Sequence, residues 1–444
     1  MAGRPAGRSH KSGTKDERKR RDSNRAVLKT GESQRSDTGI YCYRWTDKQH
    51  KRHTIYASTL KELRQKEDDI TRDHIDGIRT YNEYTLNDLY ILWCRIKKGL
   101  RDSTFTNYKY MYEQFVKDSI GRMRIKDIKK STLRAFYNGL IENSYMKVST
   151  VDTVHNIIHQ LLEIAVDDGY LRVNPADRAL TELKRSKNHD VKKVKALTKK
   201  EEDALLGFIR DHEVYGRWYP IFAVLLGTGM RIGEATGLRW VDVDLERGFI
   251  DVNHTLVYYS HGKEEGCAYE INNTKTPAGF RMIPIMSSVR EAFLMEKAFQ
   301  ERAHIKCNAR IAGYTDFVFL NRFGSVMNQG IINKVIRRIV RDYNEVQFLK
   351  AEQGDILPDD VTLLPMFSCH SLRHTFATRM VEAGVNVKVV QEVLGHADVS
   401  TTLNIYTDAG DDFKKDQMHM MEMKYGADKE EESDSNVLPF TKAI

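Results

Sequence analysis

The C-terminal half of the chain contains side chains that suit chemistry on a phosphate ester. Arg231 and Arg373 can each offer planar, two-point hydrogen bonding to phosphate oxygens, and both stay charged at physiological pH. His370 lies three residues before Arg373, so a helix would present the two side chains on one face. His396 and Tyr406 follow them. Taken singly, each of these residues is typical of an ion-pairing or packing side chain.

The sequences around these residues carry more information than the residues alone. In chain order they read TGMRIGE at Arg231, NNTKTPAG at Lys275, HSLRHTFAT at His370 and Arg373, LGH at His396, and TLNIYT at Tyr406. This ordered set resembles the tyrosine recombinase (phage-integrase) family. It departs from the family pattern in one respect: His396 and Tyr406 are ten residues apart, one more than in many members, and a longer turn can absorb the difference.

The resemblance implies a reaction in which Tyr406 attacks a DNA phosphodiester and becomes linked to its 3′-phosphate. A free tyrosine has a pKa of about 10, so it is a poor nucleophile until it is oriented and its proton is accepted. The attack builds negative charge on the phosphate oxygens, which Arg231 and Arg373 would stabilise. His396 would add a hydrogen-bond donor, and His370 would take the tyrosine proton or steady the phosphate.

Lys275 resembles the general acid of the family, which protonates the departing 5′-oxygen of the deoxyribose. Strands expected on either side predict that Lys275 lies at the tip of a hairpin, where a lysine is ordinarily a solubilising charge. Because the phosphotyrosyl bond keeps the energy of the broken bond, the reaction of the family requires neither ATP nor a metal. We therefore expect no cofactor and no metal site.

Two carboxylates near the arginines are interpreted as structural. Glu234 and Asp242 are expected to form ion pairs with Arg231 or with Arg239. The HSLRH segment has two histidines at helical spacing, but it lacks the glutamate of an H-E-x-x-H motif, and no C-x-x-C pair accompanies it. We therefore do not expect this segment to bind zinc.

Residues 198–410 are predicted to form the α+β catalytic domain that positions these groups. Thr198 and Glu201 have the spacing of a capping box, which predicts the start of its first helix. The region mixes helices with a few strands, which we predict at Phe249–Asn253, Tyr269–Asn272 and Arg281–Pro284.

Local signals also predict where the candidate residues lie on these elements. Arg231 is expected to open a helix after a glycine-containing turn. His396 follows Gly395, a typical helix stop. Ser400 is expected to cap a further helix, with Tyr406 early in it.

The N-terminal part is organised differently. Residues 1–36 contain eleven Lys/Arg against four Asp/Glu and are predicted to be a basic, disordered leader, either solvated or bound to phosphates. Residues 37–80 predict a small β-β(-β)-α unit, with strands around Tyr41–Trp45 and His53–Ala57 and a helix at Leu60–His74. Basic side chains on such a sheet can read a DNA groove, or they can simply protect an exposed edge.

Residues 84–183 are predicted to form a helical bundle, because apolar residues recur at helical spacing throughout. Its last helix is expected from Ser149, as the N-cap, to Asp168, with Gly169 as the stop. Residues 184–197 form a basic linker that either stays solvated or lies along phosphates. Residues 411–444 are a tail whose methionines at 418–423 could dock on a neighbouring subunit or on their own domain.

Bulk composition is consistent with a multidomain cytosolic protein. The chain has 444 residues, too many for one ordinary domain, and no apolar run long enough for a membrane span or a signal peptide. Five scattered cysteines fit reduced thiols better than a disulfide framework.

The sequence therefore predicts a multidomain, mainly α protein with small β-sheets that acts as a site-specific DNA integrase. KTGESQRSDTGIYCYRW and GYLRVNPA add a resemblance to conjugative-transposon integrases, which implies an arm-binding domain, a core-binding domain and a catalytic domain. The expected partners are double-stranded DNA at core-type and arm-type sites, a homotetramer of the chain on that DNA, and an excisionase-type accessory protein, all in the bacterial cytoplasm at the nucleoid. Two alternatives remain: a housekeeping chromosome-dimer resolvase of the same family, and an accessory DNA-binding protein without catalytic activity.

Overall fold

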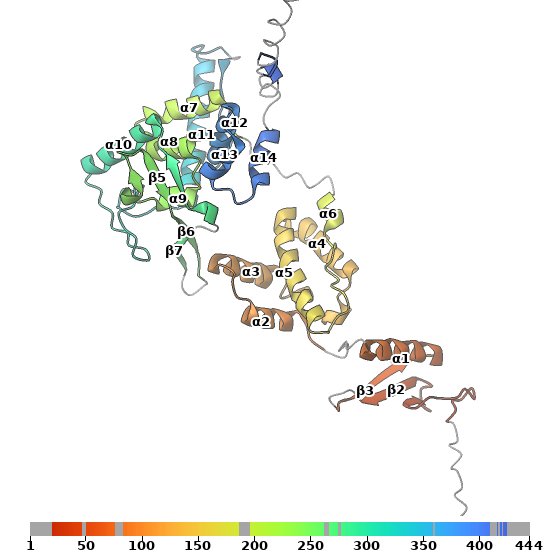
Figure 1. The fold of residues 1–444 in the computed structure, drawn as a ribbon. Coiled ribbons are helices and arrows are strands. Elements are labelled where there is room, and N and C mark those ends of the chain that lie inside the picture. The colour runs from red at the N-terminus through yellow and green to blue at the C-terminus, as the bar shows by residue number, and fades with distance from the viewer. Residues whose placement is uncertain are drawn as a thin grey trace, which may run out of the picture. The chain divides into compact units, whose positions relative to one another are not determined.

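The computed structural model describes residues 20–46, 50–75, 83–185, 196–261, 266–273, 277–357 and 360–408, with isolated positions between 415 and 423. The chain divides into two compact units, Met1–Asp190 and Val191–Ile444. Helices dominate both units, and the strands form small separate sheets (Figure 1). Within the described part, no helix is long and apolar enough to cross a membrane.

The first structured segment is a three-stranded antiparallel sheet covered by one helix. Its strands β1 (Glu32–Gln34), β2 (Tyr41–Thr46) and β3 (Arg52–Ala57) lie in the order β1-β2-β3, and α1 (Leu60–Ile75) follows. Tyr41 and Ala57 face Leu63 of α1 and form the core with it. Because side chains alternate along a strand, Arg44 and Arg52 lie on the opposite face, away from the helix.

Strand β1 corrects the predicted extent of the disordered leader, because residues 20–36 have a defined structure that includes this strand. Glu32 explains why the chain is ordered here. Its carboxylate is fully buried and accepts hydrogen bonds from Arg64 Nε at 3.0 Å and from the Lys29 backbone N–H at 2.6 Å. A buried charge paired in this way specifies one position for the strand.

Beneath this sheet, Glu67 of α1 is a second buried carboxylate. Lys29 Nζ lies 3.9 Å from Glu67 Oε2, and Oε1 has no hydrogen-bond partner among the described residues. Burial, and then the charge of Glu32, raise the pKa of Glu67 to about 7. The folded unit therefore binds a proton near neutral pH that the unfolded chain binds only in acid.

We expect the stability of this sheet unit to fall as pH rises. The pKa of Glu67 is raised above its unfolded value, so its contribution is fully present below about pH 4.5 and is lost as pH passes through 7. Between pH 5 and 8 the loss should be on the order of 2 kcal/mol. Hydrogen exchange of peptides from residues 28–75, corrected for the intrinsic pH dependence of exchange, measures it. Glu67→Gln should remove the slope, and an unchanged slope would contradict the assignment.

The second segment of this unit is a helical bundle, as predicted. Its helices are α2 (Leu86–Ile96), α3 (Asp102–Phe115), α4 (Lys130–Ser144), α5 (Val148–Asp167) and the short α6 (Thr181–Arg185). α5 buries a continuous apolar stripe against the other helices. Gly169 ends it with a φ of +73°, but Ser149 lies inside the helix and the N-cap is Lys147, so the predicted cap was two residues late.

The C-terminal unit is built around a helix that is buried on all sides, α8 (Tyr219–Thr228). The helices around its core are α7 (Lys199–Arg210), α10 (Ser287–Arg302), α11 (Gln329–Glu352) and α12 (Cys369–Glu382). α7 begins with the predicted capping box of Thr198 and Glu201. Shorter helices complete the unit: α9 (Ile232–Gly237), α13 (Val387–Leu394) and α14 (Val399–Asp408).

The strands of this unit differ in pairing from the sequence prediction. β4 (Val243–Asp244), β5 (Phe249–Val252) and β8 (Arg281–Pro284) form one antiparallel sheet, whereas β6 (His254–Ser260) and β7 (Cys267–Asn273) form a separate hairpin (Figure 1). Strand β6 was not predicted. β7 pairs with β6 and β8 pairs with β5, so these two strands do not pair with each other as the prediction for Lys275 implied; Lys275 itself lies outside the described residues.

Candidate active site

Three arginines converge on the C-terminal end of α13. Arg281 Nε donates to the Val393 carbonyl at 2.6 Å, Arg373 Nη2 donates to Leu394 at 2.7 Å, and Arg231 Nη2 donates to Gly395 at 3.1 Å. The last carbonyls of a helix have no partner within the helix and carry its negative dipole end, so they attract cations. The three guanidinium groups, which come from distant parts of the chain, therefore meet at one turn.

Arg373 is the most deeply buried of the predicted site residues. It lies on α12, is only 5% exposed, and also donates from Nη1 to the Gly229 carbonyl at 2.9 Å. Burial, and then the charge of Arg231, lower the pKa of Arg373 to about 9, which leaves it cationic at neutral pH. Two carbonyl bonds hold the guanidinium in one orientation, so its remaining N–H groups are preorganised for an anion.

Arg231 is the N-cap residue of α9, where the sequence predicted the start of a helix. It follows Gly229, which has a φ of +62° and lies so close to Phe376 that a side chain there would collide with it. Arg231 Nη1 donates to Glu234 Oε1 at 2.8 Å, yet 45% of its side chain remains exposed. One side of this guanidinium can therefore meet a ligand.

His396 follows Gly395, whose φ of +66° ends α13 as predicted. Its Nδ1 lies 2.9 Å from the hydroxyl of Thr402, a fully buried residue of α14. Burial, then the charges of Arg373 and Arg231, lower the pKa of His396 to about 4, so the ring is neutral at pH 7. If Nδ1 accepts from Thr402, the proton lies on Nε2, which can donate to a phosphate oxygen.

His370 lies in the first turn of α12 and is exposed. Partial burial, and then the charges of Arg373 and Arg231, lower its pKa. A mainly neutral imidazole at pH 7 is a proton acceptor, which suits one of the two roles that the sequence suggested. The ring of His374 meets it edge-on, with ring centroids 4.8 Å apart.

Tyr406 is not assembled with the cations in this structure. It lies near the end of α14, and its hydroxyl donates to the Val385 carbonyl at 2.6 Å. Val385 precedes α13, whereas the three arginines bind its C-terminal end, and the eight residues of this helix span about 12 Å. Burial also raises the pKa of Tyr406.

Two details of α14 differ from the sequence prediction. The helix begins at Val399, and Asp398 caps its first turn by accepting from the Ser400 backbone N–H at 2.9 Å, so Ser400 is not the cap. Tyr406 is the eighth residue of the helix and not an early one. Lys275, the remaining candidate, lies outside the described residues.

Three further side chains contact the candidate residues or the turn that carries His396, and the sequence did not predict them as members of the site. They are Arg281, Thr402 and Glu234, which the sequence predicted only as an ion-pair partner of an arginine. Glu234 is buried and bonds both Arg231 and Arg281 at 2.8 Å, while Asp242 pairs with Arg239 at 2.8 Å, as predicted for these carboxylates. The sequence does contain a signal for Arg281. It lies two residues before the core residue Ile283 in the same strand, so the two side chains share one face, and an arginine on a buried strand face requires a partner.

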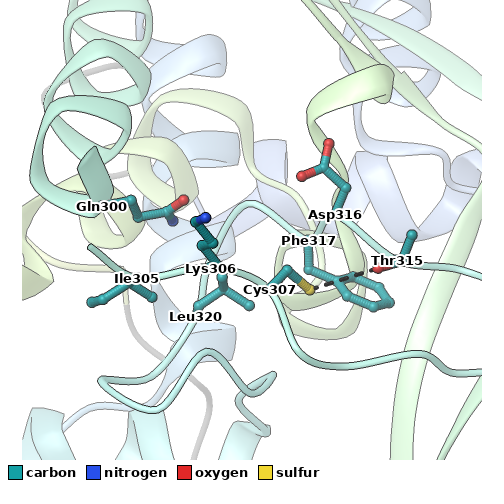
Figure 2. Close-up of a pocket in the computed structure, with 8 residues that line it drawn as sticks. All are labelled: Gln300, Ile305, Lys306, Cys307, Thr315, Asp316, Phe317 and Leu320. Atoms are coloured by element: carbon teal, nitrogen blue, oxygen red, sulfur yellow. Dashed lines mark hydrogen bonds between the residues drawn. The ribbon is translucent and has the colours of Figure 1, made fainter. Parts of the chain in front are cut away.

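Two cavities of the C-terminal unit differ in whether candidate residues line them. A groove of about 410 Å³ between β8 and α13 includes Arg281 and His396 in its lining. A second pocket, of about 350 Å³, lies next to the end of α10 (Figure 2). It is lined by Gln300, Ile305, Lys306, Cys307, Thr315, Asp316, Phe317 and Leu320. None of the candidate residues lines this second pocket, whereas His396 lines the first groove, so the first groove adjoins the candidate site.

Three protein families match segments of the chain. The phage integrase family matches residues 195–412, which contain every candidate residue. The DNA binding domain of tn916 integrase matches residues 16–74, and the phage integrase N-terminal SAM-like domain matches residues 85–141.

Whole-length relatives agree with these matches. The transposase from transposon Tn916 of Enterococcus faecalis is 31% identical over 405 residues, covering 88% of this chain and 94% of the relative. A XerC-like tyrosine recombinase of Caldanaerobacter subterraneus is 26% identical, covering 80% and 88%. Among solved structures, the Tn1549 transposon integrase in complex with a circular intermediate DNA superposes with a TM-score of 0.64 at 27% identity, covering 76% of this chain and 99% of that one.

Proposed function

The chain belongs to the phage-integrase family of tyrosine recombinases, and from that premise we propose that Tyr406 is its nucleophile. As a member of this family it is a site-specific recombinase that binds DNA and integrates and excises a mobile element. The observation that carries the assignment of roles is the convergence of Arg231, Arg373 and His396 at the end of α13. Incubation with nicked core-site DNA tests it: a gel-stable, protease-sensitive adduct on a 3′-phosphate is expected.

In the proposed mechanism the cations hold the scissile phosphate before bond making starts. Arg231 and Arg373 bind its non-bridging oxygens, and His396 donates to one of them from Nε2. The tyrosine oxygen attacks phosphorus while His370 accepts its proton. The bond from phosphorus to the 5′-oxygen breaks, and that oxygen leaves with a proton from Lys275. A 5′-hydroxyl of the partner strand then reverses the reaction and completes the exchange.

Activation requires Tyr406 to leave the Val385 carbonyl. The hydrogen bond at 2.6 Å holds the hydroxyl at the opposite end of α13 from the arginines. α14 carries both Tyr406 and Thr402, and Thr402 contacts His396, so a shift of this helix would move the nucleophile relative to the phosphate site. We propose that binding of DNA supplies this shift, so that the free chain stays inactive.

The two alternatives explain less of the chain. A housekeeping chromosome-dimer resolvase does not account for the match of residues 16–74 to the tn916 integrase DNA-binding domain. A non-catalytic accessory protein does not account for the three preorganised arginines. Two of them, Arg373 and Arg281, are nearly buried, and backbone carbonyls and the Glu234 carboxylate hold them in place. Integration of a mobile element remains the function that the site and the N-terminal domain support together.

We propose that residues 37–80 bind arm-type sites near the ends of the element. The helix-free face of the sheet presents Arg44 and Arg52, and a sheet of this size can enter the major groove. The proposed core-binding domain (residues 84–183) and the catalytic domain (residues 198–410) clamp the core site, and the linker (residues 184–197) follows the phosphates.

Replacing Arg44 and Arg52 with alanine should weaken arm-site binding about tenfold per arginine, because each loses a base-edge or phosphate contact. Core-site cleavage should be unchanged. Fluorescence anisotropy with arm-site duplex at several salt concentrations measures the affinity. Arg72→Ala is the matched control, because Arg72 is exposed on α1, on the other side of the sheet. Deletion of residues 1–80 should abolish integration and spare cleavage, and an unchanged integration rate would contradict the arm-binding role.

We propose further that the chain assembles as a homotetramer on DNA, with an excisionase-type protein directing excision, in the bacterial cytoplasm. Strand exchange through a four-way junction uses four cleavage centres, which supports four copies. Exposed methionines at 418, 421 and 423 offer an adaptable apolar surface that a neighbouring subunit could bind.

A further inference from the structure

Arg281 is an almost completely buried arginine beside the proposed site, and the roles assigned above do not use it. It opens β8 and shares the inner face of this strand with Ile283. Only 5% of its side chain is exposed. Since no buried charge is stable alone, its partners show what this residue does.

The first set of partners belongs to the turn that presents His396. Arg281 Nε donates to Val393 at 2.6 Å, immediately before the carbonyls that Arg373 and Arg231 bind. The turn is packed closely on Arg281. A side chain added at Gly395 would lie 3.1 Å from Arg281 Nη1 and 2.8 Å from the Ala278 carbonyl.

The second partner is Glu234. Arg281 reaches its carboxylate with Nη2 at 2.8 Å and Nη1 at 3.3 Å, and Arg231 reaches the same carboxylate at 2.8 Å. A buried carboxylate with one arginine is a neutral pair. With two arginines, the group of three keeps one positive charge, so Arg231 can still attract a phosphate. Glu234 is buried, but Arg281 and then Arg231 stabilise its ionised form and lower its pKa.

We propose that Arg281 is a positioning residue for strand cleavage: it offsets the charge of Glu234, which leaves Arg231 available to the phosphate, and it fixes the turn that presents His396. This inference rests on the proposed function, in which Arg231 and His396 hold the scissile phosphate. The Arg281 side chain is only 5% exposed, and its guanidinium is hydrogen-bonded to Val393, Gly279 and Glu234, so it acts through the two residues that these groups position.

Removing the positive charge should slow cleavage without weakening DNA binding. Arg281→Met in the full-length chain should lower the single-turnover cleavage rate on saturating nicked core-site DNA about 10- to 100-fold, as expected for a misplaced phosphate ligand. Adding Glu234→Gln should restore part of the rate, because the charge to be offset is then gone. Arg281→Lys keeps the charge but not the two-point geometry, so it should react at an intermediate rate.

A titration of His396 separates this role from a merely structural one. The charged groups around His396 are Arg373 and His374 from α12, Arg231 before α9, and Arg281 from β8. Loss of Arg281 should move the titration of His396, followed by NMR of ¹³C-labelled histidine, toward higher pH. Arg281→Lys should titrate like the wild type.

Arg239→Met is the matched control, because Arg239 forms a two-point pair with Asp242 in the same unit but contacts no carbonyl of α13. It should melt lower and leave both the His396 titration and the cleavage rate of the folded protein unchanged. A wild-type rate in Arg281→Met, an unshifted titration, or a double variant slower than the single one would overturn the proposal. An adduct formed by Tyr406→Phe would instead overturn the proposed nucleophile, while the His396 titration would still decide the role of Arg281.

Discussion

Replacing Tyr406 with phenylalanine should abolish the covalent adduct with DNA while leaving core-site binding intact. The change removes one oxygen atom, which is the only atom that can bond to phosphorus in the proposed mechanism. The hydroxyl donates to the Val385 carbonyl and to no other group that the structure resolves around it, so its loss should cost stability only on the order of 1 kcal/mol. Nicked core-site DNA labelled next to the scissile phosphate, resolved on a denaturing gel before and after protease, measures the adduct.

Tyr215→Phe is the control for this result. Its hydroxyl is also hydrogen-bonded within the same unit, to Asp342 Oδ2 at 2.5 Å, but it lies outside the proposed site. This variant should form the adduct at the wild-type rate. The reactions are run in EDTA, in which the wild type should keep its full rate, since the proposed chemistry uses protein cations alone. An adduct formed by Tyr406→Phe, or no adduct formed by the wild type, would refute the proposed nucleophile.

Arg373→Lys should lower the cleavage rate about 100- to 1,000-fold, the range found when one preorganised donor to a developing charge is lost. The guanidinium uses Nη1 and Nη2 for the Gly229 and Leu394 carbonyls and still has N–H groups for the phosphate. An ammonium group is shorter, has three donors and cannot satisfy two fixed carbonyls while binding a phosphate in two-point geometry. Single-turnover cleavage on the nicked substrate, compared with equilibrium binding of intact core DNA, separates catalysis from affinity.

Arg379→Lys offers a control on the same helix. Arg379 forms ion pairs with Glu202 and Glu382 and donates to the Leu197 carbonyl at 2.6 Å, so the substitution removes a similar set of contacts elsewhere. The folded protein should cleave DNA at nearly the wild-type rate. If Arg379→Lys slowed cleavage as much as Arg373→Lys, the effect would reflect the stability of α12 and not phosphate binding.

Much of the secondary structure could be predicted from neighbouring residues. The capping box of Thr198 and Glu201 and the glycine stops at Gly169 and Gly395 appear where they were expected. These signals work because a cap or a left-handed residue acts within one turn of the chain. They failed where two local signals compete: Asp398 and Ser400 are both good caps, and the structure selects Asp398.

Strand pairing was harder to predict. The predicted strands at 269–272 and 281–284 exist, but they belong to different sheets, because β7 pairs with the unpredicted β6 and β8 pairs with β5. The unpredicted β6 reads HTLVYYS, which lacks the strict alternation of apolar and polar residues that reveals a strand. Alternation indicates which residues can form a strand, but the partner depends on packing elsewhere in the chain.

The sequence by itself determined which groups are available for the chemistry: two arginines, two histidines, a lysine and a tyrosine in an order that resembles one family. Only the tertiary structure decided how they are arranged. It joins Arg231 to Gly395 across 164 residues, recruits Arg281 through Glu234, and places the Tyr406 hydroxyl on Val385 at the other end of α13. The physical reason is that a sequence pattern specifies neighbours within a turn or along a strand. Contacts between distant segments form only when buried helices and strands pack together and their buried charges must find partners.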